Sequence, residues 1–161
     1  MKEIKDAQRK WLEAKAKAAR LRESEGNADL AAKLNACQMF KGDESLEGLV
    51  DLMFSPQGAE FLTKFGFPDL RTFRKFKKYH PERLGVYIDC GEIVLNDESR
   101  VFLVGNTAAK LNYSKTQGNR VVMMHGATAT IIAEGYSVVK VENDGSSKMS
   151  LIKKDSARVL A

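Results

Sequence analysis

Cysteine and proline are scarce in this chain, whose 161 residues include two Cys and three Pro. Cys37 and Cys90 lie far apart in unlike surroundings, which argues against a disulfide-stapled secreted fold and for reduced thiols in the cytoplasm. No apolar run approaches the roughly 20 residues that span a bilayer. The first thirty residues are charged throughout and lack the apolar stretch of a secretory signal, so we expect no membrane contact.

Motifs for metal and phosphate binding are missing as well. His80 and His125 are the two histidines and stand 45 residues apart, and neither a C-x-x-C nor an H-x-x-x-H pattern is present. Such close pairs are typical of zinc ligands. The segment Gly105–Lys110 lacks the second glycine of a phosphate-binding loop. We therefore expect neither a metal nor a cofactor.

The residues offer little material for nucleophilic catalysis. A Cys–His hydrolase would have to use Cys90 and His125, with Asp89 or Glu92 as the third group. No local signature surrounds either residue, and a cysteine at a strand end usually serves packing. We expect a protein that is not an enzyme and keep the hydrolase as a remote alternative.

The chain does carry charge, with a net value of +5, but that charge is unevenly distributed. Residues 1–25 have a net charge of +3, residues 26–63 of −4, residues 64–84 of +5 and residues 85–161 of +1. Seven of the eight Phe precede residue 77, whereas Val, Ile, Thr, Ala and Gly dominate beyond residue 84. We therefore expect a helical subdomain over 1–84 that caps a β region over 85–161.

The first half has the periodicity and the punctuation of helices. Apolar residues recur at spacings of three and four from Ile4 to Leu21, and Gly26 and Gly66 stand where helices should end. Ser55-Pro56 and Asp69 are typical helix starts. The expected helices cover residues 4–21, 30–38, 46–53, 56–64 and 70–79.

The second half is typical of short strands. Runs of β-branched and apolar residues are separated by Gly, Asn, Asp or Ser, and no connection has the length of a helix. The expected strands cover residues 86–89, 92–95, 101–104, 109–113, 121–124, 129–133, 138–141, 148–152 and 158–160.

A weak internal repeat runs through these strands. Val101–Val104 followed by Ala109–Leu111 returns twenty residues later as Val121–Met124 followed by Ala129–Ile131, and a looser copy begins at Val138. This period favours a β-solenoid, in which each coil stacks on the previous one. An antiparallel sandwich or meander would give similar runs, so the periodicity alone leaves both open.

The segment from Leu70 to His80 is the most basic stretch of the sequence. On a helix, Arg71, Arg74, Lys75 and Lys78 would form one cationic stripe that contacts the phosphates of a nucleic acid or another acidic partner. A solvated outer face near the acidic residues 43–51 explains the same pattern, and we favour it because a net charge of +5 is modest.

The N-terminal stripe is the candidate surface for self-association. Ile4, Trp11 and Leu21 belong to a seam of three heptads whose remaining positions are alanines, which is short and weakly apolar for a coiled coil. An intramolecular hairpin with residues 27–38 also explains the seam, and we favour the hairpin.

Several segments in the last hundred residues resemble a known module. Phe67–Leu70, Pro81–Glu92, Val101–Thr107 and Met124–Ala129 are similar to stretches of uncharacterised Bacteroidales proteins found near phage or mobile-element genes. The resemblance implies a small right-handed parallel β-helix after a helical lead, and it implies no activity. We expect an α+β protein that acts as a structural or interaction module for an unknown protein partner, or by self-association, with nucleic acid as the less favoured partner.

Overall fold

The computed structural model describes residues 2–36 and 41–161 of the chain. Cys37 therefore lies outside the described residues. The chain divides into two compact units, residues 1–53 and residues 54–161. The expected change from helix to strand does occur near residue 85, but the division between compact units falls earlier, so the last helices belong to the same unit as the strands.

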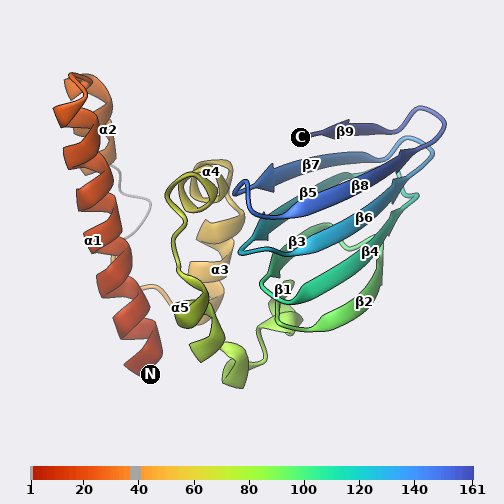
Figure 1. The fold of residues 1–161 in the computed structure, drawn as a ribbon, viewed down its shortest axis with the longest axis horizontal. Helices are drawn as coiled ribbons and strands as arrows, with labels where there is room; N and C mark the ends of the chain where they lie inside the picture. The colour runs from red at the N-terminus through yellow and green to blue at the C-terminus, as the bar shows by residue number, and fades with distance from the viewer. Residues whose placement is uncertain (1, 37–40) are drawn as a thin grey trace. The chain divides into compact units, whose positions relative to one another are not determined.

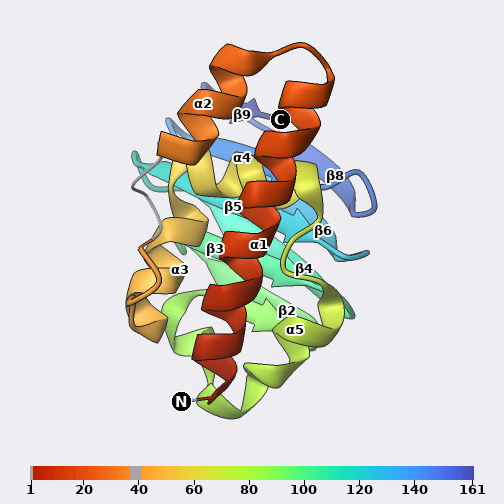
Figure 2. The ribbon, with the colours of Figure 1, turned by 90° about the vertical axis from the view of Figure 1, so that its left-hand side faces the viewer.

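The first unit consists of helices. They are α1 (Lys2–Ser24), α2 (Ala28–Ala36) and α3 (Leu46–Phe54), whose last residue already belongs to the second unit. Gly26 adopts a φ of 78° between α1 and α2, and the Leu30 N–H donates to the side chain of Asn27 at the start of α2. The two helices lie side by side as a hairpin (Figure 2). Among the described helices, none combines the length and apolar character that a membrane crossing requires.

The second unit opens with short helices. They are α4 (Pro56–Phe65), α5 (Leu70–Lys75) and two 3-10 turns, η1 (Lys77–Tyr79) and η2 (Pro81–Leu84). Ser55 accepts a hydrogen bond from the Gly58 N–H at the start of α4, and Gly66 ends this helix in the left-handed conformation. Asp69 caps α5 in the same way by accepting from Thr72. These are the helix starts that the sequence predicts.

The strands wind into a β-solenoid of roughly four coils, which we call the β-coil (Figure 1). Parallel pairing joins β1, β3, β5, β7 and β9 into a five-stranded sheet and β2, β4, β6 and β8 into a four-stranded sheet. The strands are β1 (Val86–Ile88), β2 (Gly91–Asn96), β3 (Arg100–Val104), β4 (Thr107–Tyr113), β5 (Gly118–Met124), β6 (Thr128–Ala133), β7 (Val138–Asn143), β8 (Lys148–Lys153) and β9 (Arg158–Leu160). The predicted solenoid is confirmed, and the antiparallel sandwich is wrong.

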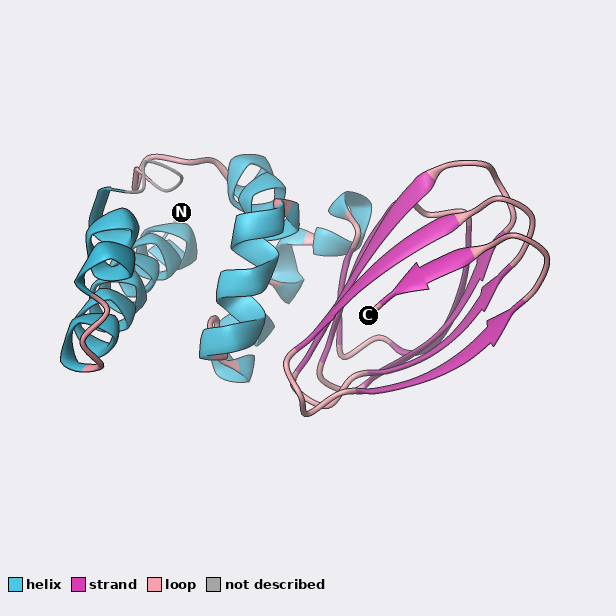
Figure 3. Cartoon of the chain, turned by 90° about the horizontal axis from the view of Figure 1, so that it is seen from above, coloured by secondary structure: helices cyan, strands magenta, loops and turns pink. Residues whose placement is uncertain are grey.

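Figure 3 shows the two sheets as opposite walls that loops join at both ends. Val101 pairs with Val121 and Ala109 with Ala129, which are the repeat partners expected from the sequence. The first coil is shorter, since Val86 pairs with Phe102 only sixteen positions later. In the looser third copy, Val141 and not Val138 lies beside Val121.

Apolar side chains fill the space between the sheets in columns. Leu111, Ile131 and Leu151 occupy equivalent positions on successive strands, and the first two are completely buried. Val121, Met123 and Val139 meet them from the opposite sheet as part of the same cluster. This core is continuous along the coil, so each coil is stabilised by the ones on either side of it.

The outer faces of the two sheets have different surroundings. On the five-stranded sheet, Phe102, Val104, Val122 and Met124 point away from the coil interior and are still completely buried. Helix α4 packs on β5 and β7, and the Phe102 ring lies 5.8 Å from those of both Phe54 and Phe73. The four-stranded sheet instead alternates buried and exposed residues, as a sheet with one solvated face does.

The interior column provides a direct test of this fold. We expect Ile131→Ala to lower the free energy of unfolding by about 2–5 kcal/mol, because it removes methyl groups from a closed core and leaves a cavity. Ile152→Ala is the matched control, since Ile152 is 47% exposed on the outer face of the neighbouring strand, and it should cost less than about 1 kcal/mol. Urea unfolding followed by circular dichroism measures both. Equal destabilisation by the two variants would contradict the register.

Candidate functional site

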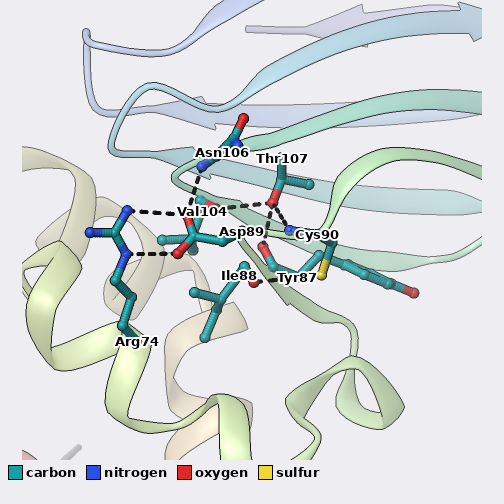
Figure 4. Close-up of polar contacts among 8 residues, drawn as sticks. All are labelled: Arg74, Tyr87, Ile88, Asp89, Cys90, Val104, Asn106 and Thr107. Atoms are coloured by element: carbon teal, nitrogen blue, oxygen red, sulfur yellow. Dashed lines mark hydrogen bonds and ion pairs between the residues drawn. The ribbon is translucent and has the colours of Figure 1, made fainter.

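A cluster of polar contacts that includes the predicted site residues Arg74 and Cys90 lies at the corner between β1 and β2 (Figure 4). Asp89 turns the chain there with a φ of 49°, a left-handed conformation that Asp tolerates better than most residues. Its carboxylate accepts hydrogen bonds from the Asn106 N–H at 2.8 Å and from Arg74 Nε at 2.7 Å. The corner therefore joins the first coil to the second coil and to α5.

Gly105 occupies the equivalent corner of the second coil and must be glycine for two reasons. Its φ is 66°, and an added Cβ would lie 2.5 Å from Asp89 Oδ1 and 2.9 Å from Leu70 Cδ1. A side chain here would push the carboxylate away from its partners. The small residue in the β3–β4 turn thus makes room for the Asp89–Arg74 ion pair.

Thr107, the first residue of β4, stabilises the same corner by hydrogen bonds. The Thr107 hydroxyl accepts a hydrogen bond from the Cys90 N–H at 3.0 Å and is itself 3.0 Å from the Val104 carbonyl oxygen, to which it donates. The residue is 2% exposed, and its hydroxyl and its backbone N–H both find hydrogen-bond partners inside the protein. This network holds the backbone on both sides of Cys90.

The charges at the corner affect one another. The hydrogen bond from Arg74 lowers the pKa of Asp89 below its ordinary value of 3.8, and the Asn106 N–H adds to this effect against the opposing effect of burial. Arg74 is one of the four predicted cationic residues, and its guanidinium is already engaged by this carboxylate. The corner has the geometry of a structural ion pair.

The structure does not bring Cys90 and His125 together by a hydrogen bond within the described residues. Cys90 Sγ lies 4.0 Å from Glu82 Oε1 and 3.6 Å from the Ile88 carbonyl oxygen, and burial raises the pKa of the thiol. His125 belongs to the corner of the third coil, where Nε2 donates to the Pro68 carbonyl oxygen at 2.6 Å. Nothing in this geometry activates the thiol as a nucleophile.

The structure also bears on the metal site and on the second carboxylate of the hydrolase. Among the described residues, no three His, Cys, Asp or Glu side chains lie close enough together to hold a metal ion. Glu92, the other carboxylate considered for the hydrolase, is exposed on β2.

The basic segment differs from the single helix expected over residues 70–79. Helix α5 ends at Lys75, and the Phe76 N–H bonds to the Phe73 carbonyl oxygen in the tighter 3-10 pattern. His80 then adopts a left-handed conformation. It directly precedes Pro81, and a residue before proline disfavours the α-helical conformation, so α5 cannot continue through it. The expected continuous stripe is therefore wrong at its C-terminal end, because Lys78 lies on η1 and not on α5.

The four predicted cationic residues remain on the surface despite this break. Arg71, Arg74, Lys75 and Lys78 are all exposed. Lys78 Nζ lies over the Tyr79 ring, 5.3 Å from its centroid. The segment thus presents positive charge to solvent, with Arg74 held by Asp89.

The predicted self-association residues are in different environments. Ile4 and Trp11 are buried, with 7% and 4% of their surface exposed, whereas Leu21 is 47% exposed. Self-association through this seam stays a prediction, and the burial of Trp11 gives it no added support.

A groove crosses the outer face of the four-stranded sheet, with a volume of about 970 Å³. It runs across all four strands between two rows of outward side chains. One row is Glu92, Ala108, Thr128 and Lys148, the other is Val94, Lys110, Thr130 and Ser150, and the floor is the backbone of Ile93, Ala109, Ala129 and Met149. Small side chains on the central strands make the groove, and two lysines and one glutamate supply its charge.

Sequence reasoning missed this groove, although a signal was present. Strand β3 reads Arg-Val-Phe-Leu-Val without a break in apolar character, whereas β4 alternates as Thr-Ala-Ala-Lys-Leu-Asn-Tyr. Continuous apolar strands are typical of a sheet covered on both faces, and alternating ones of a sheet with one free face. The comparison predicts which sheet is open to a partner.

The Asp89–Arg74 pair makes stability depend on pH. The pKa of Asp89 is lowered on folding, so the ionised carboxylate adds to the free energy of unfolding. This stabilisation is complete at a pH above the ordinary pKa of 3.8 and is lost as the pH falls through the lowered pKa. We expect Asp89→Asn, which keeps a left-handed residue at the corner, to lower the urea midpoint at neutral pH. The difference in urea midpoint between Asp89→Asn and the wild type should shrink at a pH below the ordinary pKa of Asp89.

The matched control for this measurement is Glu60→Gln, an exposed carboxylate of α4. It should leave the urea midpoint unchanged at both pH values. A difference for Asp89→Asn that persists in acid would show that the ionised form of Asp89 is not what stabilises the corner.

Comparisons with protein families, with curated proteins and with solved structures find no match to this chain.

Proposed function

We propose that the chain is a non-enzymatic interaction module whose four-stranded sheet binds an extended segment of a protein partner. The groove across this sheet is the observation that carries the proposal. Helices cover the outer face of the five-stranded sheet, whereas the groove face carries exposed side chains, among them Val94 with 62% of its surface exposed.

The central strands of the groove restrict how a partner can bind. β4 and β6 each pair with a neighbour on both sides, so their backbone groups are already hydrogen-bonded. A partner cannot add a strand there and has to contact the side chains. With strands about 4.8 Å apart, the four-stranded groove spans roughly 14 Å, the length of a short extended peptide.

The lining residues define the chemistry of that peptide. Ala108, Thr128 and Thr130 leave room for small or unbranched side chains and offer hydroxyl groups for hydrogen bonds. Lys110 and Lys148 would favour a carboxylate over the centre and the β8 end, and Glu92 a cation over the β2 end. The partner should therefore carry its acidic residues toward one end.

Photocrosslinking and groove-filling variants together test this function. A photoreactive amino acid at Thr128 should crosslink a partner in an extract of the producing cells, and the same group at Tyr136, an exposed corner residue outside the groove, should not. A peptide that contains the crosslinked segment should bind Thr130→Trp and Lys110→Glu at least tenfold more weakly than the wild type. Tyr136→Trp is the matched control, and equal binding by Thr130→Trp would refute the proposal.

Nucleic acid is the second candidate partner, on the strength of the exposed basic segment. Besides the four predicted residues, Lys77 and Arg83 are exposed on η1 and η2. Such a surface can neutralise several phosphates without reading sequence. The engagement of Arg74 by Asp89 weakens this candidate relative to the groove.

Binding to mixed-sequence DNA and RNA over a salt series separates the two candidates. If the basic segment binds phosphates, changing Arg71, Arg74, Lys75 and Lys78 to Gln should make the dependence of log K on log salt less steep, by about one unit for each phosphate that is no longer neutralised. Changing Lys2, Lys5, Lys17 and Arg20 of α1 to Gln removes the same charge elsewhere and serves as the control. Absence of binding at low salt would exclude this candidate.

The biological setting rests on the sequence alone. A phage or mobile-element context follows from the resemblance of the last hundred residues, and a cytoplasmic location from the unlike, widely spaced surroundings of the two cysteines. Both stay predictions.

A further inference from the structure

The two ends of the β-coil carry opposite charges. The first coil, residues 86–99, has no Lys or Arg and contains the acidic residues Asp89, Glu92, Asp97 and Glu98. The last coil, residues 148–161, contains Lys148, Lys153, Lys154 and Arg158 against a single acidic residue, Asp155. Within the β region the acidic residues are thus concentrated in the first coil and the basic residues in the last, although Arg74 of α5 already pairs with Asp89.

Each end also presents a strand edge with exposed apolar side chains. β2 and β8 are the two outer strands of the four-stranded sheet, each with one neighbour among the described residues. Val94 on β2 is 62% exposed, and Leu151 and Ile152 on β8 are 43% and 47% exposed. Leu151 continues the buried column of Leu111 and Ile131, so the core is open at this end.

We propose that a second copy of this chain binds head to tail, with its β2 adding to the edge of β8. The inference goes beyond the proposed groove function, although Glu92, Val94 and Lys148 of the two edge strands also line the groove. It extends the parallel pairing that already joins β6 to β8, so the new strand would meet the free backbone groups of β8. In this register residues 82–85 of the second copy fall where residues 158–161 lie beside β7, so the three-residue strand β9 has to move aside when the copies join.

The register of the existing pairs predicts the contacts. Glu92, Ala108, Thr128 and Lys148 form one row, so the next position in that row places Glu92 of the second copy beside Lys148. The same register places Leu95 of the second copy beside Leu151. Both pairs are favourable, the first by charge and the second by burial of apolar surface.

The opposite charges continue into the corner beyond these strands. Asp97 follows Asn96, which pairs with Asn112, so Asp97 is level with Tyr113. Tyr113 pairs with Ala133, and Ala133 pairs with Lys153. The register therefore places Asp97 of the second copy beside Lys153. The same spacing brings Glu98 of the second copy toward Lys154. The Asp97 carboxylate already accepts hydrogen bonds from Ser114 and Lys115, so Glu98 and Lys154 are the pair that extends the complementary charge beyond the strands.

Other pairings of the same edges are unfavourable. Two β8 edges side by side would bring lysines together, and two β2 edges would bring acidic residues together, which destabilises a sheet. On the five-stranded sheet, η2 already packs against β1. The head-to-tail arrangement is not closed by a two-fold axis, so it adds copies in one direction and forms an open-ended assembly.

Charge exchange at one pair of positions tests the proposal. Sedimentation velocity of the 161-residue chain over a wide range of concentration should show growing species for the wild type, and less growth as salt rises. Lys148→Glu and Glu92→Lys each place like charges at the contact, and each should raise the dissociation constant about tenfold. Both residues are exposed on the outer face, so the fold should tolerate either change.

Two further samples make the test specific. The double variant Lys148→Glu/Glu92→Lys should assemble again, and so should an equal mixture of the two single variants, because every end then meets an opposite charge. Lys110→Glu is the matched control, since Lys110 is an exposed lysine of the same sheet on an internal strand, and it should assemble like the wild type.

The results that would overturn the proposal are equally definite. A wild-type chain that stays monomeric at all concentrations would do so, as would a dimer of fixed size that the single exchanges leave intact. A double variant that fails to recover assembly while its circular dichroism spectrum is unchanged would also exclude the predicted register.

Discussion

The parallel stacking of segments twenty residues apart is the constraint on which the β-coil depends. The strands satisfy one another's backbone groups along each sheet, but the corners interrupt the pairing and leave N–H groups that need acceptors. Carboxylates of neighbouring coils supply them: Asp89 accepts from Asn106, Asp97 from Ser114, Asp144 from His125 and Asp155 from Gly135. The acidic corner residues are thus part of the framework, and the corners hold each coil in register with the next.

The two sheets of one coil have separate roles because their outer faces differ. The five-stranded sheet is apolar on both sides and holds α4 and α5, while the Asp89–Arg74 pair fastens the end of α5 to a corner. The four-stranded sheet contributes only its inner face to the core, which leaves its outer side chains without a packing role. Function is therefore best sought on the face whose residues the fold does not need.

The sequence predicts the coil well for a physical reason. Strand positions and the pairing of Val101 with Val121 depend on local composition and on a short period, both of which a single sequence contains. The sixteen-residue first coil, the early end of α5 and the ion pair between Arg74 and Asp89 depend on contacts made only after folding, and no local pattern reports them. The groove could be predicted in part. Polar and apolar residues alternate in β4 and not in β3, and comparing the two strands shows which sheet has a free face.

The twenty-residue period has a consequence for how such a chain can change its length. Within the β-coil each internal coil pairs only with the coils on either side of it, and this pairing sets no fixed number of coils. Duplication of one period, such as residues 118–137, would add one strand to each sheet and about 4.8 Å to the groove while keeping every row in line. An insertion of half a period would place residues of the five-stranded sheet at positions of the four-stranded sheet, because the strands of the two sheets alternate about every ten residues. Growth by whole coils is thus the natural way for this architecture to adapt to a longer ligand.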